Sequence, residues 1–462
     1  PKTPKPRQIV ICLNSHMTDD VDPEFYKNYP AYVLKIKPTT FTELQIRRPT
    51  IHYLDETPDG EFKTKDKLGT DKATEVFVVE DKNSKTWRMK VFSPLGIRIF
   101  ADEVKLNRSI DYPLINGVLA AYEQENYHVI SALNGPTLKA AAESRSFSEA
   151  EVRQIAWSIL LSVNIMHERG LCLNELSADD FSLPADGPDV QEVQTQDAGM
   201  CFVFLENLAG ATTSAADGVK ANLSQVADIV TMLLTNLVSK DEKSETSKAV
   251  EEFIAALRQA STAKEILSHP FIADIKPTVL NAHLSNLKSS KISCKMHEVL
   301  LMAAYTFVLD NQSKYALMMS FLAADKTHKG YLLPEDMQGI GIAAPIFKRL
   351  NLYSSGKLSF HEFCVAAMSK EVLTDENVLK IFKMLDIYEK GFLTLDDFER
   401  WFGSKKYPWD SVIKEALQEL GHHKLPKDEP AKPLPEIKDK PPYTLSADDL
   451  AAIATQLAEK HR

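Results

Sequence analysis

Three twelve-residue segments in the second half of the chain share one pattern, and this repeat most restricts how that half can fold. The segments are Asp325–Asp336, Asn351–Glu362 and Asp386–Asp397. Each begins with Asp or Asn, carries glycine at its sixth position and leucine at its eighth, and ends with Asp or Glu. The surrounding residues, 295–400, have a mostly helical pattern. Because glycine permits a sharp turn, the repeat predicts an all-α array of helix–loop–helix units.

The length and charge of the chain limit its domain count and its partners. With 462 residues, 44% of them hydrophobic, it has room for about three domains with buried cores. Its apolar runs are interrupted well before the ~18 residues that a bilayer-spanning helix needs, so no such helix is expected. The net charge of -10 argues against nucleic acid as the main partner. Five scattered cysteines predict neither a disulfide framework nor a metal site, and favour a reducing compartment.

Local patterns divide the first half of the chain into an extension, strands and helices. Prolines punctuate residues 1–64 and prevent a long helix there. Residues 75–79 and 87–92 are rich in β-branched and aromatic side chains, which predicts a hairpin. Helices are predicted over 148–168, 222–238 and 246–259. The first of these begins with a capping box at Ser148, and its apolar spacing predicts one buried face.

The order of hairpin, helical lobe and helix–loop–helix array resembles a calcium-dependent protein kinase of the kind found in plants and protists. The resemblance covers roughly residues 65–421. Four stretches carry it. Residues 67–91 resemble the nucleotide-lobe hairpin of a kinase, and residues 103–115 resemble the helix that supplies the glutamate partner of the lysine. Residues 262–272 resemble the end of the C-lobe, and residues 286–288 resemble the start of the junction before the calmodulin-like part. It implies an α+β fold class. A two-lobed protein-kinase-like fold, with a small β-rich N-lobe and a helical C-lobe, would be followed by an all-α EF-hand domain.

The resemblance also implies a remnant nucleotide site in the first lobe. Lys90 and Glu103 match the lysine and glutamate that position the phosphates of ATP in a kinase. The alternative for this pair is a structural ion pair that supports the sheet. The glycine-rich loop keeps only Gly69, and Asp71 would bring a carboxylate close to the triphosphate. ATP is therefore a weak cofactor candidate.

The catalytic loop departs most from the family pattern. A working kinase takes its base from His-Arg-Asp and holds magnesium with an asparagine five residues later. Here Leu-Asn-Glu ends at Glu175, Ser177 replaces the phosphate-contacting lysine, and Asp180 replaces the asparagine. A glutamate base is one methylene longer, and a displacement of ~1 Å can lower the rate about a hundredfold. We expect no phosphoryl transfer and therefore a pseudokinase.

The magnesium-binding aspartate of the family has two candidates in this chain. Asp197 matches the letters of the motif, because Ala and Gly follow it. Glu206 matches by position, because it follows the strand-like residues 201–205, and we favour it while the choice stays open. Asn222 stands where the family has a structural aspartate at the start of its central C-lobe helix. Neither candidate restores a complete metal site.

Calcium needs oxygen ligands at loop positions 1, 3, 5 and 12. Lysine occupies the fifth position of the first and third loops, as Lys329 and Lys390, where it would place a cation. Only the second loop keeps a weak ligand set, which is Asn351, Ser355 and Glu362. No fourth ligand series follows the predicted helix at 410–420. Calcium is therefore a weak cofactor candidate, although the fold of the loops is kept.

These patterns predict six segments. They are an N-terminal extension (1–64), a pseudokinase domain (65–275), a junction helix (276–312), a degenerate EF-hand domain (313–421), a proline-rich linker (422–443) and a C-terminal amphipathic helix (444–462). The extension and the last helix are expected to bind other proteins of a larger assembly.

The sequence favours a non-catalytic scaffold protein. Two alternatives stay open: a calcium- or nucleotide-responsive regulator, and an atypical active Ser/Thr kinase with Glu175 as its base. The N-terminus lacks the apolar core of a secretory signal and begins with proline. A cytoplasmic place, associated with the cytoskeleton or a cilium, is expected, and import into a mitochondrial complex stays open.

Overall fold

The computed structural model describes residues 62–460, with several gaps. The gaps are 72–73, 82–83, 94–95, 124–125, 174, 186–199, 209–210, 214–215, 236–245, 291, 293–294, 352–354, 387–389, 396, 399–408 and 420–443. The predicted linker at 422–443 and nearly all of the predicted extension at 1–64 lie outside the described residues. Among the described helices, none has the length and hydropathy of a bilayer-spanning segment.

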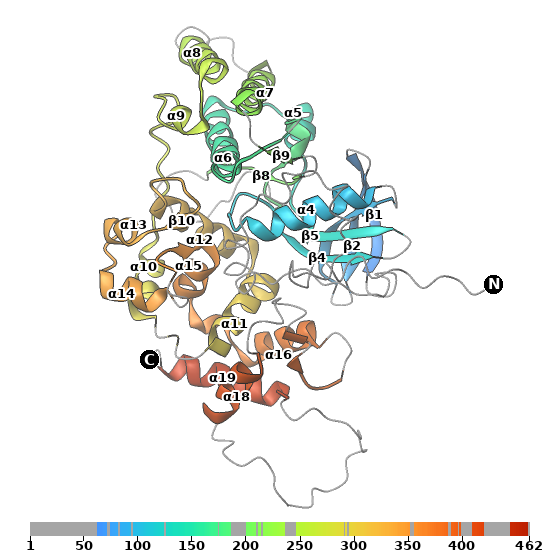
Figure 1. The fold of residues 1–462 in the computed structure, drawn as a ribbon, viewed down its shortest axis with the longest axis vertical. Helices are drawn as coiled ribbons and strands as arrows, with labels where there is room; N and C mark the ends of the chain where they lie inside the picture. Colours follow the sequence, from blue (N-terminus) through green and yellow to red (C-terminus); the bar gives the residue numbers. More distant parts are fainter. Residues whose placement is uncertain are drawn as a thin grey trace, which may run out of the picture.

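An antiparallel sheet forms the N-terminal part of the described chain (Figure 1). Its strands, in spatial order, are β1 (Phe62–Asp71), β2 (Thr74–Asp81), β3 (Thr86–Phe92), β5 (Tyr127–Ala132) and β4 (Val118–Glu123). The predicted hairpin is confirmed as β2 and β3, which pair in register from Thr74 opposite Phe92 to Glu80 opposite Thr86. The strand β1 begins ahead of the domain start predicted at residue 65.

The helix α4 (Ile97–Ser109) covers one face of this sheet. Its Phe100 and Val104 pack against Phe92 of β3 and against Val118 and Val129 of β4 and β5. All five side chains are buried. This apolar contact fixes α4 over the middle strands and thereby sets where its polar side chains lie.

A helical lobe follows the sheet and is built around α6 (Glu149–Glu168). Its other elements are α5 (Leu138–Ser144), β6 (Leu171–Leu173), β7 (Phe181–Ser182), β8 (Phe204–Leu205), β9 (Ala211–Thr213), α7 (Ala216–Thr235), α8 (Thr246–Gln259) and α9 (Ala263–Leu267). The predicted capping box is confirmed, because the Ser148 hydroxyl accepts from the Glu151 N–H and the Glu151 carboxylate accepts from the Ser148 N–H. The helices predicted at 222–238 and 246–259 correspond to α7 and α8.

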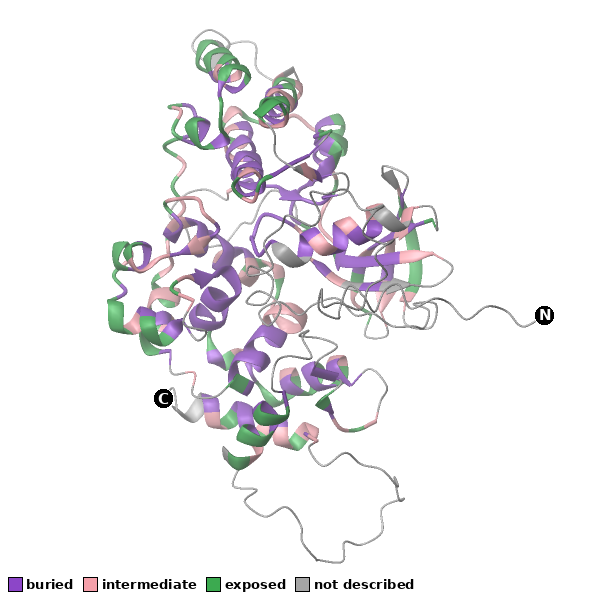
Figure 2. Ribbon diagram, in the orientation of Figure 1, coloured by how far each residue is buried: buried purple, intermediate pink, exposed green. Residues whose placement is uncertain are grey.

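The helix α6 is more deeply buried than its sequence pattern predicts. Every residue from Ile155 to Met166 is buried, so the expectation of a single buried face is wrong (Figure 2). Polar positions inside this stretch find backbone partners: the Ser158 hydroxyl donates to the Ile155 carbonyl, and the Ser162 hydroxyl donates to the Ser158 carbonyl. Those hydrogen bonds let polar residues lie in the core without unsatisfied groups.

A second helical part, termed here the C-terminal module, extends from residue 281 onward. Its helices are α10 (Asn281–Ser289), α11 (Lys295–Ala303), a π-helical turn (Ala304–Val308), α12 (Asn311–Ala324), α13 (Pro334–Gly339), α14 (Ala344–Leu350), α15 (Phe360–Ala367), α16 (Asp375–Leu385), α18 (Trp409–Glu419) and α19 (Ala447–Lys460). The junction predicted as one helix is therefore divided, with α10 ending at Ser289 and α11 changing into the π turn after Ala303.

The repeated loops join helices of this module as the sequence predicts. The first lies between α12 and α13 and the second between α14 and α15, and their strands β10 (Tyr331–Leu332) and β11 (Leu358–Ser359) pair antiparallel. The three glycines have φ of +76°, +74° and +78°. This left-handed backbone is strained for residues with a Cβ atom, which explains the glycine at the same position of each loop.

The C-terminal helix α19 packs inside its own module. Its Leu450, Ile453 and Leu457 are buried, on the side that faces α16 and α11. Just before it, the backbone of Leu445 exchanges two hydrogen bonds with Leu393 in the third loop, at 2.8 and 3.1 Å. The expectation that this apolar face binds another protein is therefore corrected, because the chain folds back and buries the face itself.

The C-terminal module is joined to the helical lobe through the first loop and α15. The Asn164 side-chain amide of α6 donates to the His328 carbonyl at 2.9 Å. Asp111, which follows α4, is hydrogen-bonded to the His361 ring of α15, and both residues are buried. The apolar core is continuous between the lobe and the module, so the contact is an extended packed interface.

Substitution of Gly330 tests this interface. A Cβ atom there would lie 2.9 Å from Ile165 Cδ1 and 3.2 Å from Tyr112 Cδ2, whereas a Cβ atom at Gly356 would meet nothing within 4 Å. Both variants carry the backbone penalty of about 1 kcal/mol. In urea titrations, Gly330→Ala should lose about 1–2 kcal/mol more of the free energy of unfolding than Gly356→Ala, because it also overpacks the contact. Equal losses would contradict the docked arrangement.

Candidate functional site

Lys90 on β3 and Glu103 on α4 form a buried ion pair beneath the sheet. The Lys90 Nζ lies 2.7 Å from the Glu103 Oε1, and each residue is only 2% exposed. The pairing predicted from the sequence is therefore present. Burying a charged pair is favourable only with good geometry and additional hydrogen bonds. Lys90 has such additional acceptors.

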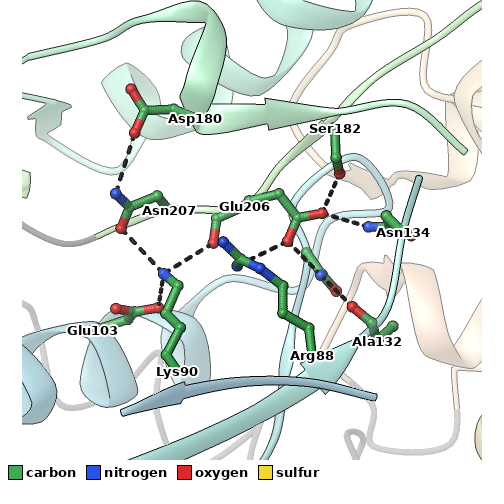
Figure 3. Close-up of polar contacts among 10 residues, drawn as sticks. Arg88, Lys90, Glu103, Ala132, Asn134, Asp180, Ser182, Glu206 and Asn207 are labelled. Atoms are coloured by element: carbon green, nitrogen blue, oxygen red, sulfur yellow. Dashed lines mark hydrogen bonds and ion pairs between the residues drawn. The ribbon is translucent and has the colours of Figure 1, made fainter. Parts of the chain in front are cut away.

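Lys90 continues into a polar chain that crosses to the helical lobe (Figure 3). Its Nζ donates to the Asn207 Oδ1 at 3.2 Å and to the Glu206 carbonyl at 3.4 Å. The Asn207 amide then donates to the Asp180 Oδ1 at 3.2 Å. The other Asp180 oxygen accepts from the Ser177 N–H at 2.8 Å and from the Ser177 hydroxyl at 3.1 Å. Both oxygens of the Asp180 carboxylate thus have protein donors.

The Glu206 carboxylate points away from Lys90 and gathers a second polar cluster. It pairs with Arg88 of β3 at 3.2 Å, and their side chains are only 3% and 11% exposed respectively. The amides of Asn116 and Asn134 donate to it at 2.7 and 2.6 Å, and the Ser182 hydroxyl also donates to it (Figure 3). The Glu206 carboxylate therefore joins the sheet, the segments around β4 and β5, and the helical lobe. We call these five residues the Glu206 cluster.

The polar chain from Lys90 and the Glu206 cluster are separate because adjacent residues of an extended segment point to opposite sides. Glu206 and Asn207 directly follow the strand β8, so one side chain faces Arg88 and the other faces Lys90. The sequence interpretation selected Glu206 by its position after the strand but did not identify Asn207. Because side chains alternate along an extended segment, Asn207 could have been identified as the residue that faces Lys90 once Glu206 was assigned to the other side.

The remaining predicted residues are placed as follows. Glu175 and Ser177 are exposed residues in the segment after β6, whereas Asp180 is buried in a short 3-10 turn. Asp197 lies outside the described residues. Asn222 lies within α7 rather than at its start, and its side chain is hydrogen-bonded to the N–H and the carbonyl of Leu173.

The position of the predicted phosphate loop is taken by paired strands. Gly69 lies opposite Val76, and Asp71 lies opposite Thr74 at the end of β1. This leaves only residues 72–73 between the two strands. The retained glycine has a φ of +148° at a register shift in the pairing, so its conformation belongs to an irregular strand.

The first and second repeated loops direct their initial side chains to their own backbone. Asp325 accepts from the N–H groups of Gly330 at 2.7 Å and Lys329 at 3.1 Å. Burial raises the pKa of the Asp325 carboxyl to about 6, although these amide contacts act in the opposite direction. In the second loop, Asn351 Oδ1 accepts from the N–H and the hydroxyl of Ser355.

In the third loop, the ammonium group of Lys390 lies against the acidic residue at position 12 of the loop. The Lys390 Nζ lies 2.6 Å from the Asp397 Oδ2 and 3.3 Å from the Thr394 hydroxyl. Asp386 accepts from the N–H groups of Lys390 and Gly391. Within the described part of the chain, no group of three or more His, Cys, Asp or Glu side chains is arranged to hold a metal ion.

Comparison with known proteins gives limited similarity to kinases. No family model matches the chain. A probable myosin light chain kinase of Dictyostelium discoideum is 25% identical over 178 residues, which are 36% of this chain and 56% of that protein. The chain thus spans about half the length of this curated relative. A crystal structure of the Rad53 kinase domain and SCD2 matches with 18% identity and a TM-score of 0.38, covering 48% of this chain and 91% of that one.

The similarity in sequence and the arrangement of elements agree on a kinase-like fold. A sheet-rich N-terminal part carries the Lys90–Glu103 pair, and a helical part follows it. The weak similarity to a kinase sequence supports the same fold for this region.

Removing the charge of Glu206 tests the energetic role of its cluster. A Glu206→Gln variant leaves the Arg88 guanidinium buried without a carboxylate, and losing one partner of a buried pair typically costs about 3–5 kcal/mol. We expect a loss near the lower end of that range in urea unfolding, since glutamine keeps some of the hydrogen bonds. The matched control is Asp228→Asn, which breaks an exposed pair with Arg258 and should change stability by less than about 1 kcal/mol. Similar losses in both variants would refute a structural role for the cluster.

Proposed function

We propose that this chain is a non-catalytic, pseudokinase-type protein whose cleft is closed by its own side chains and which serves as a scaffold in a larger assembly. The observation that carries the proposal is the pair of polar clusters between the sheet and the helical lobe. In kinases, this lysine, a metal-binding aspartate and a catalytic-loop asparagine surround the nucleotide phosphates. Here the corresponding side chains are hydrogen-bonded to one another.

Asn207 is the residue that takes the metal-aspartate position in this proposal, in place of Asp197 or Glu206. Its amide oxygen accepts from Lys90 and its amide nitrogen donates to Asp180. Magnesium needs oxygen ligands from this pair, but the Asn207 oxygen holds a cation already and both Asp180 oxygens accept protein donors. The donor set therefore fits a structural network better than a Mg·ATP site.

The Glu206 cluster opposes nucleotide binding independently. Arg88 precedes Lys90 by two positions on β3, so both side chains lie on the same face of the sheet. The Arg88–Glu206 pair is mostly shielded from solvent, fills part of that face with charge and is bridged to the helical lobe by Ser182. A nucleotide base would have to displace the pair and leave both charges desolvated, which is unfavourable.

The contacts in the C-terminal module support a degenerate EF-hand domain. Two loops paired through β10 and β11, with glycine at the turn, have the helix–loop–helix organisation of calcium-binding modules. In the third loop, the Lys390 ammonium lies against Asp397, the residue at position 12. The ammonium supplies positive charge where calcium would otherwise sit, so the loop is held in shape without the ion.

The absence of transfer chemistry is testable with a phosphate-transfer assay on the full chain. With Mg·ATP and general peptide substrates, we expect no transfer above background, and Glu175→Ala should give the same result. The reason is that the exposed Glu175 stands at the base position in place of the family's aspartate, and Lys90, the candidate phosphate-binding group, is paired with Glu103. Transfer that disappears in Glu175→Ala would contradict the scaffold and favour an atypical kinase.

Substitution of Lys390 tests whether the stability of the chain is independent of calcium. The melting temperature of the wild-type chain should be the same in calcium and in EGTA. A Lys390→Asp variant supplies a carboxylate beside Asp386 and Asp397, so calcium should raise its melting temperature by mass action. Lys390→Met is the matched control, because it removes the cation without adding a ligand.

Two outcomes separate the possibilities for these loops. A calcium-dependent shift confined to Lys390→Asp supports the proposed substitution of an ammonium for calcium. A shift in the wild-type chain would contradict it and favour a calcium-responsive regulator, with Asn351, Ser355 and Glu362 of the second loop as the ligands to mutate next.

A further inference from the structure

A cavity lies between the N-terminal sheet and the C-terminal module. Its lining includes Asn116 and Asn134 of the Glu206 cluster but not Lys90, Asn207 or Asp180. Its volume is about 990 Å³, which is in the range of sites for small molecules. The walls come from the start of β3, from the π turn and from α12. Residues distant in sequence therefore form one concave surface.

Two lysine side chains converge on one carbonyl at the wall of this cavity. Lys85 Nζ donates to the Thr306 carbonyl at 3.4 Å, and Lys314 Nζ donates to the same oxygen at 3.2 Å. Thr306 belongs to the π turn, near the end of its helix, where carbonyl groups point out of the helical ladder. A single neutral oxygen thus has two ammonium groups around it.

The charge of this lysine pair is incompletely balanced by the protein. Asp81 attracts Lys85 and Asp310 attracts Lys314, but in both cases burial has the larger effect and lowers the pKa of the lysine. The nearby carboxylates are engaged locally: Asp81 accepts from the Trp87 indole and the Lys85 N–H, and Asp310 caps α12. Burial and the positive charge of Lys85 lower the pKa of Lys314 to about 7, and Asp310 only partly opposes them.

Aromatic rings lie beside both ammonium groups. Lys85 Nζ is 4.4 Å from the centre of the Trp87 ring, and Lys314 Nζ is 5.7 Å from the centre of the Tyr305 ring. Both rings line the cavity. The surface therefore combines two lysine amines with aromatic rings. An anion bound between the amines would favour their charged forms, so the site suits an anionic group attached to a planar or apolar body.

We propose that this cavity binds a small phosphate monoester, with Lys85 and Lys314 holding the phosphate and Trp87 and Tyr305 contacting the attached group. A phosphate monoester carries between one and two negative charges near neutral pH and accepts several hydrogen bonds. It would neutralise the two ammonium groups together and remove their mutual repulsion. The proposal does not depend on the Lys90 site, whose lysine is already paired with Glu103.

Calorimetric titration of the full chain with phenyl phosphate tests this site. We expect saturable binding at one site per chain, weaker binding of inorganic phosphate and none of phenol. Lys314→Met and Lys85→Met should each weaken the affinity by at least about tenfold. Lys314→Arg keeps the charge and should retain binding. Lys248→Met is the matched control, because that lysine of α8 is 81% exposed and does not line the cavity.

The outcomes decide the proposal even if one variant is altered in folding. Circular dichroism checks the fold of each variant, and Lys314→Met is expected to fold because it removes a buried charge. Absence of saturable phenyl phosphate binding to the wild-type chain overturns the site. So does equal affinity in the Lys314→Met, Lys85→Met and Lys248→Met variants. Equal affinity for phenyl phosphate and inorganic phosphate overturns the contribution of the aromatic rings.

Discussion

The buried carboxylate of Glu206 is the contact on which the closed arrangement of sheet and helical lobe depends. It accepts hydrogen bonds from Arg88, Asn116, Asn134 and Ser182, which come from four separate segments of the chain. Burying a charge is unfavourable unless its partners are complete. The number of donors around this carboxylate meets that condition. The same cluster joins the sheet to the helical lobe and includes Arg88 of β3, the strand that carries Lys90.

In the C-terminal module, polar groups of the loops are likewise hydrogen-bonded or paired within the protein. Backbone N–H groups satisfy Asp325, and the Lys390 ammonium pairs with Asp397. The module is also fixed to the helical lobe through Gly330 and to the segment after α4 through the Asp111–His361 contact. Loops that change shape on binding an ion need a second, accessible arrangement. Here the packed contacts favour one arrangement, which agrees with a structural role.

The sequence predicted the features that depend on local pattern. The hairpin, the capping box of α6 and the glycine turns follow from residue type and spacing, whereas the Lys90–Glu103 pair was implied by the resemblance to calcium-dependent protein kinases. It did not predict Asn207, because the choice between two adjacent residues depends on which face of the segment meets Lys90. Nor did it predict that α19 returns to its own module, since the intervening residues have no pattern that sets a direction. Arg88 was not singled out because its role depends entirely on tertiary partners.

The most direct measurement of the central claim is equilibrium dialysis of the full chain against radiolabelled ATP with magnesium. If the Glu206 cluster and the Lys90–Asn207–Asp180 chain occupy the cleft, the protein should retain no nucleotide above the level of an unrelated protein. Saturable binding of about one nucleotide per chain that is lost in a Lys90→Met variant would contradict the claim, because it would require these side chains to leave one another and hold the ligand instead.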